Sequence, residues 1–218
     1  MHHLHCHRRH CIALAAAAAT LWLTPVHAQG KASISKILVL GDSLSAEYGL
    51  ARGTGWVALL EQKLAQQKKA IQLVNASVSG ETTSGGRSRL PALLKQHQPQ
   101  LVVIELGGND ALRGLPLTNT EDNLRLMLQV TQESGAKGLL VGMQIPPNFG
   151  ARYASDFGQM FARVAQDTRT PLVPFLLKGV ADAPNAAALF QADRIHPKAE
   201  AQPTMLNNVW PVLQPLLG

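Results

Sequence analysis

Short apolar runs recur along this chain, and a segment with helical spacing separates each run from the next. Each run is apolar almost throughout, which predicts strands that are buried on both faces. Strands of this kind, joined through helices, form a parallel sheet with helices on both sides. The sequence therefore predicts an α/β protein, a doubly wound three-layer α/β/α sandwich around a five-stranded parallel sheet. The predicted strands are Ile37–Leu40, Ile71–Val74, Leu101–Leu106, Gly138–Gln144 and Leu172–Pro174.

Segments with one apolar and one polar face fill the intervals between these strands. Pro91 stands near the start of one such segment and is acceptable only in the first turn of a helix. Two prolines within Ile145–Gly150 predict a loop without a regular element. Leu176–Ala192 shows no clear pattern. The predicted helices are Trp56–Leu64, Leu90–Gln96, Glu121–Glu133, Tyr153–Gln166 and part of Lys198–Leu217.

The first 28 residues have the composition of a cleavable export signal. Arg8 and Arg9 give a basic start, Ile12–Leu23 is an apolar run, and Val26-His27-Ala28 offers small residues around a cleavage site. The apolar run, about 12 residues long, is too short to span a bilayer comfortably. We therefore predict a signal peptide at residues 1–28, a single domain at residues 29–218, and a periplasmic or secreted location.

Removal of this segment changes the inventory of reactive groups. Cys6 and Cys11 would leave with it, so the mature chain has no thiol, and only His97 and His196 remain of eight histidines. The Lys and Arg residues fall from 20 to 18 against 14 Asp and Glu, a dispersed excess unlike a nucleic-acid-binding surface. We expect a monomer with no metal, no cofactor and no nucleic-acid partner, and at most transient contact with membrane lipids.

Polar residues and glycines follow four of the predicted strands. In doubly wound sheets, ligands bind beyond the carboxyl ends of the strands. Ser43 comes just after the first strand, Gly80 after the second, Asn109 after the third, and Asp193 and His196 after the fifth. A turn such as Gly-Asp-Ser is common by itself, but four turns at one edge predict a shared site.

A base for Ser43 is available in Asp193-Arg194-Ile195-His196-Pro197. Asp193 can fold back to accept the Nδ1 proton of His196, which leaves Nε2 to take a proton from Ser43. Pro197 fits the first position of the last helix. The other histidine, His97, stands at a helix C-terminus on the opposite edge, where a structural role is expected.

Fixed hydrogen-bond donors for an oxyanion are predicted at three positions. The Gly80 N–H can approach a substrate because glycine has no side chain. Asn109 follows a Gly-Gly pair and offers a neutral NH₂ group, and the Ser43 N–H is a third donor. The alternatives are a plain turn at Gly80 and a helix start at Asn109-Asp110.

Together these residues resemble the SGNH (GDSL) hydrolase family. The resemblance covers essentially the whole mature chain, and its blocks are specific in combination. It implies a flavodoxin-like fold, no cofactor, and Ser43, Gly80, Asn109 and His196 as the four residues that give the family its name. The matching blocks are Gly41–Ser45, Gly80, Gly107–Asp110 and Asp193–His196.

Neighbouring segments, notably Leu90–Pro99 and Gly107–Gly114, are similar to the exported thioesterase I / protease I / lysophospholipase L1 subgroup, which is arylesterase-like. That subgroup usually has glycine at the position of Glu47. We expect a carboxylate there to narrow or repel part of the acyl entrance. The G-x-S-x-G nucleophile elbow of α/β-hydrolases does not occur around Ser43.

The leading hypothesis is an exported serine esterase that forms an acyl-enzyme on Ser43. The resemblance implies aryl, short- and medium-chain acyl esters, acyl thioesters and lysophospholipids as substrates. Loops 111–116 and 146–153 are expected to supply apolar pocket walls. The alternatives are a carbohydrate-ester deacetylase on the same scaffold and a periplasmic binding module without turnover. The predicted substrate-binding residues are Leu112, Leu115, Phe149 and Tyr153.

Overall fold

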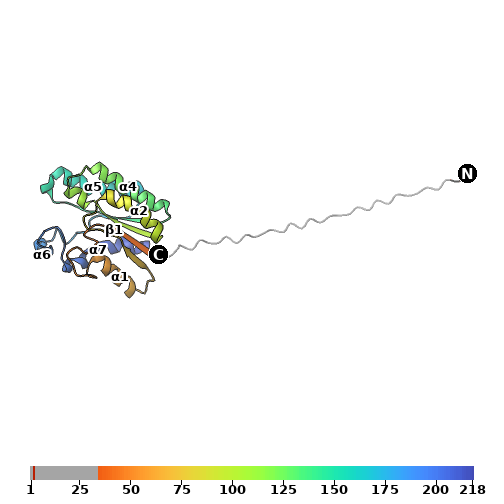
Figure 1. Ribbon diagram of the computed structural model, residues 1–218, viewed down its shortest axis with the longest axis horizontal. Helices are drawn as coiled ribbons and strands as arrows, with labels where there is room; N and C mark the ends of the chain where they lie inside the picture. Colours follow the sequence, from red (N-terminus) through yellow and green to blue (C-terminus); the bar gives the residue numbers. More distant parts are fainter. Residues whose placement is uncertain (1, 3–33) are drawn as a thin grey trace. The chain divides into compact units, whose positions relative to one another are not determined.

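Five parallel strands form the centre of the computed structural model, which describes residue 2 and residues 34–218 (Figure 1). The strands lie in the order β2-β1-β3-β4-β5, and all neighbours pair in parallel. This is the order of flavodoxin-like doubly wound sheets. The predicted α/β sandwich with a five-stranded parallel sheet is confirmed. The strands are β1 (Lys36–Gly41), β2 (Gln72–Asn75), β3 (Leu101–Glu105), β4 (Lys137–Val141) and β5 (Leu172–Val173).

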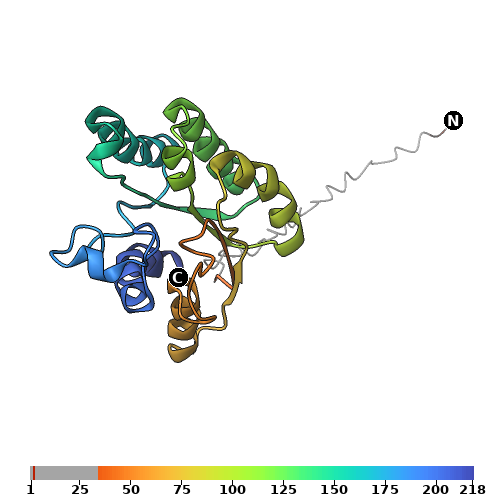
Figure 2. The same cartoon turned by 60° about the vertical axis from the view of Figure 1, so that its left-hand side comes forward.

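Helices cover both faces of the sheet, so alternate side chains of each central strand enter two different cores (Figures 1 and 2). In β1, Ile37 and Val39 pack into the core under α1 and α7, whereas Leu38 and Leu40 pack under α2, α4 and α5. All four side chains are fully buried, which explains why the strand lacks polar alternation. The long helices are α1 (Trp56–Gln66), α2 (Thr83–His97), α4 (Leu117–Glu133), α5 (Ala151–Thr168) and α7 (Gln202–Leu213).

Helix α2 begins earlier than predicted, and Pro91 therefore lies in its interior. The Thr82 side chain accepts a hydrogen bond from the Gly85 N–H and caps the helix start. The prediction that Pro91 occupies a first turn is wrong. A proline inside a helix removes one backbone hydrogen bond. Residues 87 and 91 are both exposed, so water can solvate the carbonyl left without its partner.

The segments around three other prolines also differ from the prediction. Pro197 is not the first residue of the last helix but pairs with Phe190 in an isolated antiparallel bridge. Helix α7 begins at Gln202 after a single 3-10 turn, η2 (Ala199–Ala201). The loop predicted at residues 145–150 contains a 3-10 turn, η1 (Pro147–Phe149). The remaining short elements are α3 (Gly108–Leu112), α6 (Ala186–Leu189) and η3 (Gln214–Leu216).

The predicted signal peptide at residues 1–28, with Cys6 and Cys11, lies outside the described residues except for His2 and stays a prediction. Residues 34–218 belong to one compact unit. Within them, no helix is both long enough and apolar enough to cross a membrane. His97 is the last residue of α2, and its carbonyl accepts a hydrogen bond from the Lys36 ammonium at the amino end of β1.

Candidate active site

The predicted site residues lie on segments that follow the carboxyl ends of the strands. Ser43 is two residues past β1, Gly80 is in the turn after β2, and Asn109 is in the first turn of α3, directly after β3. Asp193 and His196 lie in the segment between α6 and η2. In a parallel sheet these strand ends share one edge, so the fold gathers the segments there.

The structure brings Ser43, His196 and Asp193 into a continuous hydrogen-bonded chain. His196 Nε2 lies 2.8 Å from Ser43 Oγ, and His196 Nδ1 lies 2.7 Å from Asp193 Oδ2. The His196 side chain is 15 % exposed and that of Asp193 is 36 % exposed. In this arrangement, the imidazole can take the hydroxyl proton while the carboxylate holds its other nitrogen protonated.

A tight turn lets Asp193 reach back to His196. Arg194 has φ +58°, in the left-handed region, and the second oxygen of Asp193 accepts hydrogen bonds from the backbone N–H groups of Ile195 at 2.9 Å and His196 at 3.1 Å. The hydrogen bond with the His196 ring, followed by these N–H donors, lowers the pKa of Asp193 to about 2. Asp193 is therefore a carboxylate at neutral pH.

Asn109 is connected to the Ser43 turn through Asp42. Its amide nitrogen donates a hydrogen bond of 3.0 Å to Asp42 Oδ2, while Asp42 Oδ1 accepts from the Leu44 N–H at 3.0 Å. Asn109 has two amide hydrogens, and this bond uses one of them. The expectation of a loop from residue 111 is wrong, because α3 continues to Leu112.

Gly80 adopts a conformation that favours glycine, with φ +79°. A Cβ added to it would meet only the Arg113 guanidinium, at 3.8 Å, so the backbone at this turn is open. The Arg113 guanidinium also donates a hydrogen bond of 3.0 Å to the Gly80 carbonyl and ties the turn to the end of α3. The roles of Gly80 and Asn109 as oxyanion donors stay predictions.

Two buried carboxyl groups next to the turn at Ser43, Asp42 and Glu105, were not predicted from the sequence. Asp42 is 3 % exposed and Glu105 is 2 % exposed. Glu105 accepts a hydrogen bond from the Ser45 hydroxyl at 2.7 Å and from the Asp42 N–H at 3.4 Å. The sequence did contain a signal for Glu105, because it is the only charged residue in an otherwise apolar strand. In the structure, Glu105 pairs in register with Gly41, two residues before Ser43.

Burial makes both of these groups harder to ionise. Desolvation raises the pKa of Asp42 to about 6, although the Leu44 N–H and the Asn109 amide oppose the rise. Desolvation, reinforced by the neighbouring Asp42 charge, raises the pKa of Glu105 well above its ordinary value. Burial therefore favours the neutral form of both groups, and Glu105 has the additional contribution from the charge of Asp42.

Tyr48 and Gln191 also belong to the neighbourhood of His196 and were not predicted. The Tyr48 ring lies against the His196 ring, with centroids 4.3 Å apart and an interplanar angle of 37°. The Gln191 carboxamide donates a hydrogen bond of 2.9 Å to the Tyr48 carbonyl. Sequence spacing does not reveal these contacts, because 143 residues separate the two partners.

Exposed apolar side chains gather on the segments around the site. Of the predicted substrate-binding residues, Leu112, Leu115 and Phe149 are exposed, and Tyr153 is half-buried with its hydroxyl donating to the Leu115 carbonyl at 2.8 Å. Tyr48, Val78 and Ile195 are exposed on the other strand-end segments. Among large apolar side chains exposed in the described part of the chain, only Leu126 belongs to a different region, α4. This apolar rim can contact an acyl group.

Glu47 uses its carboxylate to hold the loop before α1. The carboxylate accepts hydrogen bonds from the Gly53 N–H at 3.0 Å and the Gly55 N–H at 2.7 Å. Glu47 itself has φ +60°, a conformation in which glycine is usually preferred. The expected effect of this residue on the acyl entrance stays a prediction, but the structure gives its carboxylate a role in the loop.

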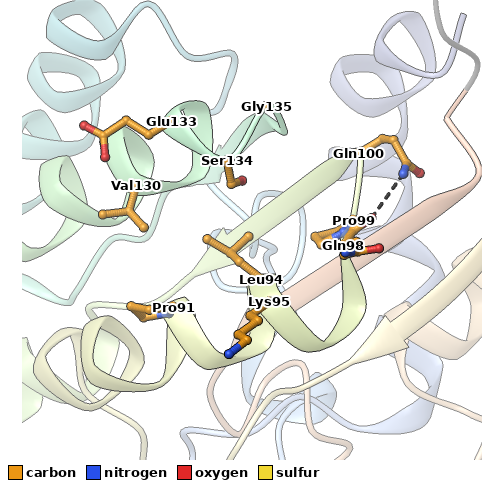
Figure 3. A pocket seen from close by; sticks show the side chains of 10 residues that line it. All are labelled: Pro91, Leu94, Lys95, Gln98, Pro99, Gln100, Val130, Glu133, Ser134 and Gly135. Atoms are coloured by element: carbon orange, nitrogen blue, oxygen red, sulfur yellow. Dashed lines mark hydrogen bonds between the residues drawn. The ribbon is translucent and has the colours of Figure 1, made fainter.

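A separate hollow, with a volume of about 700 Å³, lies at the opposite edge of the sheet (Figure 3). Its walls come from the C-terminal ends of α2 and α4, together with the segment that leads into β3. None of the predicted site residues lines it. The lining residues are Pro91, Leu94, Lys95, Gln98, Pro99, Gln100, Val130, Glu133, Ser134 and Gly135.

A flavodoxin-like sandwich with a linked serine, histidine and aspartate at its carboxyl edge defines the class of α/β serine hydrolases without a nucleophile elbow. A family model identifies the branch of this class. The chain belongs to the GDSL-like lipase/acylhydrolase family, whose model matches residues 39–202. The predicted family is thereby confirmed, and the protein is an enzyme that hydrolyses ester bonds.

Curated relatives show the same branch. The chain is 50 % identical over 187 residues to esterase TesA of Pseudomonas aeruginosa, covering 86 % of this chain and 92 % of the relative. It is 43 % identical over 187 residues to thioesterase 1/protease 1/lysophospholipase L1 of Escherichia coli K12, covering 86 % and 87 %. A solved structure of TesA covers 84 % of this chain and 100 % of its own, with a TM-score of 0.80 and 50 % identity.

Proposed function

We propose that this protein is an exported serine esterase that cleaves aryl and short- to medium-chain acyl esters, acyl thioesters and lysophospholipids through an acyl-enzyme on Ser43. The observation that carries the proposal is the hydrogen-bonded chain from Ser43 Oγ through His196 to Asp193, with separations of 2.8 and 2.7 Å. This chain provides a nucleophile, a base in contact with it, and a fixed charge that orients the base.

In the first half-reaction, Ser43 Oγ attacks the substrate carbonyl while its proton moves to His196 Nε2. The new imidazolium then gives that proton to the leaving oxygen or sulfur, and the bond between the carbonyl carbon and the leaving group breaks. In the second half-reaction, His196 takes a proton from water, which attacks the acyl carbon. The Ser43 oxygen then leaves, is reprotonated by His196, and releases a carboxylic acid.

Negative charge on the carbonyl oxygen develops in both half-reactions. The proposed donors are the N–H groups of Ser43 and Gly80 and the second amide hydrogen of Asn109. Support comes from the hydrogen bond to Asp42, which fixes the Asn109 amide beside the Ser43 turn, and from the open backbone at Gly80. Removal of one such donor lowers kcat by about 10²–10³ in a comparable site.

The apolar rim supports an acyl chain or an aryl group as the part of the substrate that is bound. Leu112, Leu115 and Phe149 are the proposed contacts, with Tyr153 held beside them by the Leu115 carbonyl. The names of the relatives, esterase and thioesterase 1/protease 1/lysophospholipase L1, agree with this range of acyl substrates. We propose a monomer that makes transient contact with lipids, and export by the segment at residues 1–28.

Replacement of the nucleophile tests the proposal directly. Ser43→Ala removes the only oxygen in contact with His196 Nε2 among the described residues, so hydrolysis of p-nitrophenyl esters is expected to fall by at least about 10³-fold. An organophosphonate should add one phosphonyl group to the wild type and none to the variant, as measured by intact mass. If Ser43→Ala retained most of the activity, another group would have to be the nucleophile.

A chain-length series then defines the substrate. Mature protein is assayed with p-nitrophenyl esters and acyl-CoA thioesters of increasing acyl length, and with a lysophospholipid. Leu115→Ala and Phe149→Ala should lower kcat/KM for the longer acyl groups more than for acetate, because apolar contact area is lost. Leu126→Ala on α4 removes an exposed leucine outside the rim and serves as the matched control.

A further inference from the structure

The ring of Tyr48 has no role in the proton transfers described above, yet it covers one face of the proposed base. Its centroid lies 4.3 Å from that of His196, and the two planes are inclined by 37°. Tyr48 is 50 % exposed, so packing into the core does not explain its place. Such an exposed aromatic ring, fixed against a group that becomes cationic during catalysis, indicates a function.

The backbone at Tyr48 is held from both sides. On one side, the neighbouring Glu47 takes a left-handed conformation and its carboxylate accepts hydrogen bonds from Gly53 and Gly55. On the other side, Gln191 donates to the Tyr48 carbonyl at 2.9 Å. These hydrogen bonds hold the Tyr48 backbone next to the segment that carries His196.

Gln191 also belongs to the segment that carries the base. Its backbone N–H donates to the His196 carbonyl at 2.8 Å, and its carbonyl accepts from the Arg194 N–H at 3.0 Å. A Cβ on Gly49 would collide with the Gln191 carboxamide. The absence of a side chain at Gly49 therefore lets the Gln191 side chain lie directly against the segment after β1 that carries Ser43 and Tyr48. One residue thus joins the histidine segment to the loop that carries Ser43 and Tyr48.

We propose that Tyr48 is a positioning residue that stabilises the protonated form of His196 through its aromatic face, and that Gln191 holds it there. The inference rests on the proposed serine mechanism and adds a group to it. The negative face of an aromatic ring attracts a cation within about 6 Å of its centroid. His196 is an imidazolium only after it accepts the Ser43 or water proton, so the attraction acts in the transition states of both half-reactions and not in substrate binding.

The first test is Tyr48→Leu, which keeps an apolar side chain over His196 but removes the ring. Because the interaction is absent from the ground state, kcat should fall about fivefold with KM unchanged. Tyr48→Phe, which keeps the ring, should restore most of the lost rate. An unfolding midpoint equal to that of the wild type is required of each variant, and Leu126→Ala controls for the loss of an exposed apolar side chain elsewhere.

A graded change of the ring separates its charge distribution from its bulk. Phenylalanine, difluorophenylalanine and trifluorophenylalanine at position 48 have similar sizes but progressively weaker negative faces. The proposal expects kcat to fall at each step, approaching that of Tyr48→Leu. Equal rates for phenylalanine and trifluorophenylalanine would show that the ring acts by bulk alone, and the proposal would be wrong.

Two further comparisons complete the test. Gln191→Ala should lower kcat about threefold, and its effect should largely vanish in the Tyr48→Leu background, because residues that act through one contact are not additive. The loss in Tyr48→Leu should be equal for aryl and alkyl esters. A loss confined to aryl esters would instead make Tyr48 a contact for the leaving group and would overturn the proposal.

Ser43→Ala, assayed in parallel, keeps this inference distinct from the proposed function. If Ser43→Ala is inactive and Tyr48→Leu is fully active, the serine mechanism is supported and the proposed role of Tyr48 is refuted. An active Ser43→Ala would refute the serine mechanism, and the inference about Tyr48 would fall with it.

Discussion

Two sets of carboxyl groups are hydrogen-bonded to the segments around Ser43, and the protein shifts their pKa values in opposite directions. Asp193, partly open to solvent, accepts hydrogen bonds from the His196 ring and from two backbone N–H groups, which lower its pKa to about 2. Asp42 and Glu105, in contrast, are almost fully buried, and desolvation raises the pKa of each. The same chemical group thus has two roles because its surroundings differ.

The difference in pKa between Asp193 and the buried pair indicates different roles for them. A carboxylate that stays charged and contacts a histidine can stabilise an imidazolium as it forms. The buried pair, in which desolvation disfavours the charged form of each group, accepts hydrogen bonds from Ser45, Leu44 and Asn109. In the proposed mechanism the exposed acid, Asp193, acts in the chemistry, whereas the hydrogen bonds of Asp42 and Glu105 hold the turn at Ser43 and the Asn109 amide in place.

The largest expected effect is the loss of activity on replacement of Asp193, which tests the role of its charge. Asp193→Asn keeps the oxygen that accepts hydrogen bonds from the Ile195 and His196 N–H groups. It replaces the oxygen that accepts the hydrogen bond of His196 Nδ1 by an NH₂ group, which cannot accept one. We expect kcat/KM for p-nitrophenyl esters to fall by about 10³–10⁴-fold, as for the equivalent change in a known triad. The free energy of unfolding, measured with urea, should change little because the residue is partly exposed. A loss of less than tenfold would contradict the assigned role.

The next effect concerns the pH dependence of stability. The pKa of Asp42 rises from 3.8 to about 6 on folding, so the folded state binds the proton more tightly than the unfolded state. The stability associated with this proton is complete below pH 3.8 and is lost as the pH rises through about 6, which amounts to ~3 kcal/mol. Asp193 has the opposite sign, because the stability it contributes is lost as the pH falls through about 2.

Urea unfolding of the wild type and Asp42→Asn from pH 3.5 to 7 measures this term. The difference in free energy of unfolding between the two proteins should shift in favour of the variant as the pH rises. A difference that is constant with pH would show that Asp42 does not titrate in this window. The variant's kcat reports separately on the Asn109 amide, whose partner is altered.

The fold and the main site contacts were predictable because they follow from strong, local patterns. Apolar runs separated by helices specify a parallel sheet, and a parallel sheet places every strand end on one edge. Ser43, Asn109 and His196 could therefore be grouped from the sequence alone. Asp193 could be added because a turn of three residues brings it back to the histidine.

The unpredicted features depend on contacts between residues far apart in the chain. Tyr48 and Gln191 meet across 143 residues, and Glu105 meets Ser45 across 60. The wrong predictions for Pro91 and Pro197 have a different cause. Pro91 lies inside α2 because the Thr82 cap starts the helix earlier than the apolar pattern does, and Pro197 forms a bridge with Phe190. Local propensity is overridden there by a cap and by a tertiary contact.

The smallest effect provides the sharpest test of the buried pair. Because burial raises the pKa of Glu105 and favours its neutral form, Glu105→Gln is expected to replace that form by a neutral group of similar shape that can still accept a hydrogen bond from the Ser45 hydroxyl. We expect kcat at pH 7 to stay within about twofold of the wild type, and the free energy of unfolding to differ by less than ~1 kcal/mol.

Glu105→Ala is the matched comparison, because it leaves a cavity and removes the acceptor of the Ser45 hydroxyl in a fully buried place. Its free energy of unfolding should fall by ~2–4 kcal/mol. Equal losses in the Gln and Ala variants would show that Glu105 is needed as a charged group, which would contradict the preference of this site for the neutral form. Suppose that Glu105→Gln leaves kcat and stability unchanged while Glu105→Ala lowers stability. The buried pair would then act through hydrogen bonds and packing, in contrast to Asp193, for which loss of the charge is expected to lower kcat/KM.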